Sequence, residues 1–117
     1  MIIEGEPIWR ELPGQEIIDQ GLEDLAQGKL DTPEVMLLSM ARSKLIYLGV
    51  ALPLERLSQI DEPELTLYQL MRERYPGNPF GQYKALRRRL AKLEHALTAR
   101  KYRLLRALRE AGEAGDA

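Results

Sequence analysis

The stretch PFGQYKALRRRLAKLEHALTARKYRLLRALREA, residues 79–111, decides the fold that this sequence predicts. Proline is absent after its first residue, and the one glycine, Gly81, comes early, so we expect a single helix of about 33 residues. At 100° per residue, six of its leucines fall within a sector of about 60°. This leucine stripe consists of Leu86, Leu90, Leu93, Leu97, Leu104 and Leu108. Such a narrow stripe is typical of a coiled-coil seam.

The length of this helix predicts that it extends beyond its own domain. About 33 residues span about 50 Å, whereas a compact chain of this size is about 35 Å across. Leucines left in water are unfavourable, so a second chain would cover them. Arg100 interrupts the heptad pattern at a d position. A bend at residues 99–102, with the whole stripe covered by the shorter helices of the same chain, is the alternative.

The rest of the chain has helical apolar spacing between its prolines and glycines. Thr32 followed by Pro33 is the best-marked helix start, and Asp61 with Glu64 has capping-box spacing. The segment 32–49 is apolar around most of its circumference, which is typical of a central helix. The predicted elements are helices over residues 14–27, 32–49 and 62–75 and a short helical piece over residues 53–58.

These elements predict an all-α protein, a small helical bundle of three shorter helices plus one long C-terminal helix. The chain has 117 residues and no cysteine, and 44% of its residues are hydrophobic, which suits one domain with a real core. We expect that domain to cover residues 1–111, followed by a flexible tail over residues 112–117. Because we find neither a leader segment nor a membrane span, we expect a cytoplasmic protein that does not bind membranes.

Charge is unevenly distributed along the chain. Residues 79–117 carry ten basic and four acidic side chains, whereas residues 1–78 carry seven basic and fourteen acidic ones. The side of the long helix opposite the leucine stripe is a basic face, which consists of Lys84, Arg88, Lys92, Arg103, Arg106 and Arg109. Such a face can bind nucleic-acid phosphates, with Tyr83 and Tyr102 near enough to stack on bases. The alternative is a solvated helix exterior, since the net charge of the whole chain is −1.

Catalytic and metal-binding patterns are weak. Arg89 and His95 have the Arg, five residues, His spacing, which resembles the motif of helical ribonucleases of the HEPN type, small all-helical bundles that dimerise. The resemblance implies RNA cleavage, but it covers two residues that lie well apart around the helix. Glu16, Asp19 and Glu23 share a helical face and could hold Mg²⁺, although such faces are more often solvated. We expect no metal, no cofactor and no catalytic site.

The leading hypothesis is therefore a protein–protein interaction or oligomerisation module rather than an enzyme. Its interface would be the leucine stripe, in a homodimer or on another helical protein. The alternative is a nucleic-acid-binding protein that uses the basic face, and a HEPN-like ribonuclease ranks below both.

Overall fold

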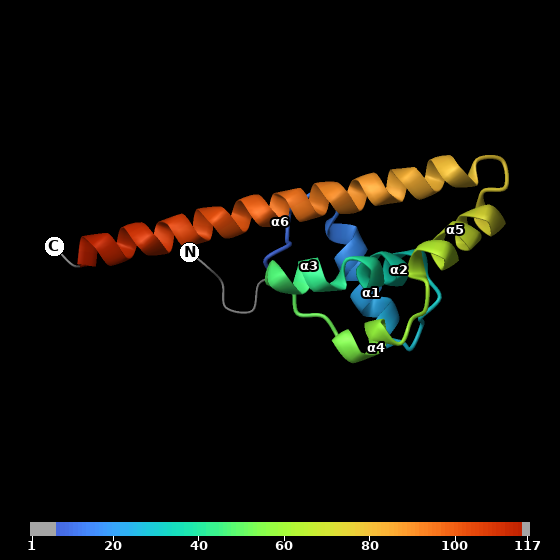
Figure 1. Cartoon of the computed structure of the whole chain (residues 1–117), viewed down its shortest axis with the longest axis horizontal. Coiled ribbons are helices and arrows are strands. Elements are labelled where there is room, and N and C mark those ends of the chain that lie inside the picture. Colours follow the sequence, from blue (N-terminus) through green and yellow to red (C-terminus); the bar gives the residue numbers. More distant parts are fainter. Residues whose placement is uncertain (1–6, 116–117) are drawn as a thin grey trace.

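One helix runs along almost the whole length of the molecule, and five shorter helices lie together on one side of it (Figure 1). The structure, a computed structural model, describes residues 7–115 of the chain. Within that range there is no β-strand, so the all-α prediction is confirmed. The helices are α1 (Gln15–Ala26), α2 (Pro33–Met40), α3 (Arg42–Tyr47), α4 (Leu54–Ser58), α5 (Pro63–Arg74) and α6 (Pro79–Gly115).

Helix α2 lies at the centre of the core, as its apolar circumference predicts. Its residues from Val35 to Ser39 are all buried, and it packs against α1 on one side and α5 on another. Its start is also as predicted, because the Thr32 hydroxyl oxygen accepts a hydrogen bond from the Val35 N–H at 3.2 Å. Helix α5 in turn packs against α6. The order α1, α2, α5, α6 therefore links the core to the long helix.

The single helix predicted over residues 32–49 is wrong in one respect, because it is broken at Ala41. There the backbone has φ −103° and ψ 11°, which ends α2 and starts α3. The Arg42 guanidinium donates a hydrogen bond to the Ser39 carbonyl at 2.6 Å, which supplies a side-chain donor at the break. After the break Leu45 is buried and Tyr47 is exposed, so α3 contributes both to the core and to the surface.

Two predicted helix ends also differ from the structure. Helix α5 begins at Pro63, so Glu62 rather than Asp61 holds the cap position. Glu62 has a left-handed backbone (φ 46°) and makes no side-chain capping bond, so the predicted capping box is absent. Helix α6 continues to Gly115, which makes the first part of the expected tail over residues 112–117 helical. Residues 116–117 lie outside the described residues.

Helix α6 is continuous, and no bend interrupts it at residues 99–102. Its 37 residues extend about 55 Å at 1.5 Å per residue. The molecule measures 62 × 27 × 22 Å, and its radius of gyration of 16.8 Å exceeds the ~13 Å of a compact chain of this length. The C-terminal end of α6 extends past α3 in Figure 1. Among residues 7–115, no helix has both the length and the apolar character needed to cross a bilayer.

Gly14 allows the start of α1 to approach α6 closely. It has φ +84°, and a Cβ added there would lie 2.9 Å from the Leu93 Cβ and 3.1 Å from the Arg89 carbonyl oxygen. We expect Gly14→Ala to lower the free energy of unfolding by about 2–4 kcal/mol, because left-handed strain adds to overpacking. Gly28 is the control, since it has φ +78° but no atom within 4 Å of an added Cβ. Gly28→Ala should cost only ~1 kcal/mol in urea unfolding, and equal costs would contradict the close approach.

Candidate interaction surface on the long helix

The leucine stripe divides into a covered part and an exposed part. Leu93 is completely buried and Leu90 and Leu97 nearly so, while Leu86 is half-buried against the same core. These side chains pack within their own chain, which corrects the prediction that Leu90, Leu93 and Leu97 lie at an interface with a partner. Further along, Leu104 is 47% exposed and Leu108 is 69% exposed. The bundle thus covers the stripe up to Leu97 and no further.

A third leucine belongs to the exposed part although it lies outside the stripe. Leu105 is 48% exposed and lies about 60° around the helix from Leu108. Together Leu104, Leu105 and Leu108 form the distal leucine cluster, at the point where α6 leaves the bundle. We did not predict Leu105, because the narrow sector drawn around the stripe excluded it.

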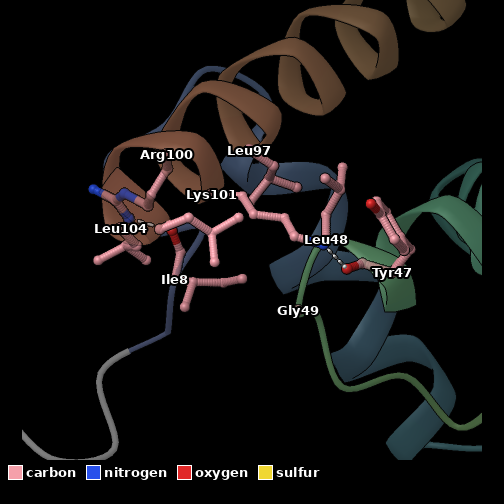
Figure 2. Close-up of a pocket in the computed structure, with 9 residues that line it drawn as sticks. Ile8, Tyr47, Leu48, Gly49, Leu97, Arg100, Lys101 and Leu104 are labelled. Atoms are coloured by element: carbon pink, nitrogen blue, oxygen red, sulfur yellow. Dashed lines mark hydrogen bonds between the residues drawn. The ribbon is translucent and has the colours of Figure 1, made fainter. Parts of the chain in front are cut away.

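An apolar groove of about 280 Å³ lies beside this cluster. Figure 2 shows that its walls come from three segments far apart in the sequence: the chain before α1, the end of α3 and the middle of α6. Most of its lining is aliphatic or aromatic, so water in it is easily displaced by an apolar side chain. The lining residues are Ile8, Tyr47, Leu48, Gly49, Leu97, Arg100, Lys101, Leu104 and Leu105.

Two cationic side chains of α6 make hydrogen bonds to the other two segments that line the groove. The Arg100 guanidinium donates a hydrogen bond to the Ile8 carbonyl oxygen. The Lys101 ammonium donates to the Tyr47 carbonyl oxygen at 3.1 Å and lies 3.4 Å from the centroid of the Tyr47 ring (Figure 2). Arg100, which interrupts the heptad pattern, therefore has an intramolecular role. The groove itself was not predictable, because Ile8 and Tyr47 come next to α6 only in the folded chain.

The basic face is exposed along its whole length. Lys84, Arg88, Lys92, Arg103, Arg106 and Arg109 are all exposed. Among the described residues, the ion pairs between α6 and the bundle use other side chains: Lys44 with Glu94 at 3.1 Å, and Arg89 with Glu16 at 3.7 Å. The continuous helix thus places this face opposite the leucines, as the projection predicts. Tyr102 is exposed, whereas Tyr83 is partly covered by Tyr68.

The structure does not bring the candidate catalytic residues together. His95 is exposed on α6, and Arg89 is paired with Glu16 rather than with His95. His95 lines neither the groove beside the distal leucine cluster nor the cavities that α2, α5 and the first half of α6 form in the described part of the chain. Within the described chain, Arg89 and His95 therefore do not lie together in one site.

The acidic residues of α1 have partners that are not metal ions. Asp19 accepts hydrogen bonds from the Trp9 indole N–H at 2.8 Å and from the Gln15 amide at 2.9 Å. Glu16 pairs with Arg89. Among residues 7–115, no group of three or more His, Cys, Asp or Glu side chains has an arrangement that could hold a metal ion.

The fold and this surface define an all-helical domain with an extended C-terminal helix. Comparisons with protein-family models, with curated proteins and with solved structures find no match for the chain.

Proposed function

We propose that this protein is a self-associating interaction module, and that two copies dock through the distal leucine cluster and the adjacent groove. The observation that carries this proposal is the exposure of Leu104, Leu105 and Leu108 on a continuous helix that extends beyond its bundle. Apolar side chains that remain together in water favour burial against a partner. The lack of cysteine suits a reducing compartment, and we propose that the module acts in the cytoplasm.

The arrangement of the groove and the leucines favours a second copy as the partner. Leu104 and Leu105 line the groove, and Leu108 lies one helical turn, about 6 Å, beyond them. If two α6 helices cross antiparallel around a two-fold axis near this turn, each Leu108 lies next to the groove of the other copy. One chain thus carries both an apolar side chain and an apolar recess, as an isologous interface requires.

Charge does not oppose this arrangement. The basic face lies on the side of α6 away from the leucines, so an antiparallel pair directs the two sets of arginines outward. Arg100 and Lys101, which border the groove, already donate hydrogen bonds to the carbonyls of Ile8 and Tyr47. Since the cluster is smaller than the ~800 Å² per partner of a standard interface, we expect a dissociation constant on the order of micromolar.

Sedimentation velocity over a concentration series across the micromolar range tests this proposal. We expect the average mass to rise from the 13.4 kDa of one chain toward twice that value as concentration increases. Because an apolar contact is insensitive to salt, added salt should not dissociate the dimer. A monomer mass that stays constant over the whole series would contradict self-association.

A further inference from the structure

The basic face of α6 is a second surface that self-association does not use. From Lys84 to Arg109 it extends about 38 Å along one side of a continuous helix. Each of its six cations is exposed. Among the side chains that the structure describes, in residues 7–112, the ion pairs of α6 involve Glu94 and Arg89 and none of these cations. A line of positive charge therefore faces solvent, with the exposed Glu110 as a carboxylate on the same side of the helix.

One exposed aromatic ring lies before the first cation of this face, and another lies between its third and fourth cations. Phe80 is 59% exposed, and the Lys84 ammonium lies 5.4 Å from the centroid of its ring. Tyr102 is 68% exposed, and it lies about 20° around the helix from Arg109. Tyr83, the other candidate, packs edge-on against Tyr68 with ring centroids 5.9 Å apart, so Phe80 is the more available ring.

A shallow depression of about 420 Å³ joins the first ring to the cations around it. Its lining combines aromatic rings with three cationic side chains, which suits a flat ring attached to a phosphate. The residues that line it are Phe80, Tyr83, Lys84, Arg87, Arg88 and Ala91.

We propose that the basic face binds single-stranded nucleic acid, with phosphates on its Lys and Arg side chains and bases stacked on Phe80 and Tyr102. Exposed rings combined with a track of cations are the features that bind single strands. A duplex would leave both rings unused, because its bases are already stacked on one another. An anionic bilayer fits less well, because the apolar side of α6 that would insert is covered by the bundle from Leu90 to Leu97.

Fluorescence anisotropy with labelled 20-nucleotide oligodeoxythymidine and oligouridine tests the proposal. With six phosphate contacts the logarithm of the affinity should fall with a slope of about −4 against the logarithm of salt concentration. Affinity should then drop by roughly 100-fold or more between 50 and 200 mM salt. Tighter binding of oligouridine would identify RNA as the ligand, and tighter binding of oligodeoxythymidine would identify DNA. No binding at 50 mM salt, or tighter binding of a duplex of equal length, would overturn the proposal.

Matched variants separate the two parts of the proposed contact. Arg88→Gln with Arg106→Gln should make the salt slope shallower by about 1.4, while Arg72→Gln with Arg74→Gln, on exposed positions of α5, should leave it unchanged. Phe80→Ala with Tyr102→Ala should weaken binding about tenfold or more without changing the salt slope. Equal effects of the two arginine pairs would contradict a site on α6.

Nucleic-acid binding and self-association can fail independently, because they use opposite sides of α6. Leu108→Glu removes the side chain that we place in the partner's groove and leaves the basic face intact. A monomeric Leu108→Glu protein that still binds the oligonucleotide would support the site on the basic face. Loss of binding in that monomer would contradict a site that one chain forms alone.

Discussion

Leu93→Ala is expected to lower the free energy of unfolding by about 3–5 kcal/mol and the Tm by roughly 10–20 °C. Leu93 is completely buried, and the close approach of Gly14 leaves the start of α1 little freedom to fill the space. The substitution therefore leaves a cavity as well as removing apolar contacts. Urea and thermal unfolding, followed by circular dichroism, measure both quantities.

The control is the same substitution further along the same stripe. Leu108 is 69% exposed, so Leu108→Ala should change the stability of the monomer by no more than ~0.5 kcal/mol. Both variants should be measured at a protein concentration low enough for the monomer to dominate, because dimerisation would add to the apparent stability of the parent chain. Similar losses at the two positions would contradict the division of the stripe into a covered and an exposed part.

Leu108→Glu is expected to raise the dissociation constant of the dimer by at least ~100-fold. A two-fold interface contains the substitution twice, so the lost burial counts twice. In addition, each copy would place a carboxylate against the apolar groove of the other, where its desolvation is unfavourable. Sedimentation velocity should show a monomer throughout the concentration range in which the parent chain dimerises.

Ala99→Glu is the matched control for this second experiment. It introduces the same charge on the same helix, at an exposed position on the side opposite Leu108. The proposed interface does not include that side, so the dissociation constant should stay within about threefold of the parent value, a change of under 1 kcal/mol. If Leu108→Glu dimerised as well as Ala99→Glu, the distal leucine cluster could not be the interface.

The sequence predicts the elements of this fold well, because helix formation depends on neighbours in the chain. Residues 79–111 have no proline after the first position, and the predicted continuous helix is confirmed. Thr32 and Pro33 start α2 as expected. The break at Ala41 was not predictable from apolar spacing, because residues 42–48 continue the same pattern and the change lies in the backbone angles of one residue.

The composition of the candidate surface was only partly predictable. The projection of α6 places Leu104 and Leu108 on the side opposite the basic face, and both prove to be exposed. The projection cannot distinguish the buried Leu93 from the exposed Leu108, because periodicity gives the direction of a side chain and not the neighbours that cover it. Leu105 was missed because it lies outside the narrow sector of the stripe, and the groove was missed because Ile8 and Tyr47 come next to α6 only after folding.

By itself, the sequence determined that the last helix is long and continuous and that its leucines and its cations lie on opposite sides. Both properties follow from interactions within a few turns of one helix. Only the tertiary structure decided where the bundle stops covering that helix. The position depends on how α1, α2 and α5 pack, and on the bonds of Arg100 and Lys101 to the carbonyls of Ile8 and Tyr47. Whether a leucine of α6 is buried depends on neighbours that are distant in sequence. Which leucines belong to the core and which to the candidate interface is therefore decided only when the chain folds.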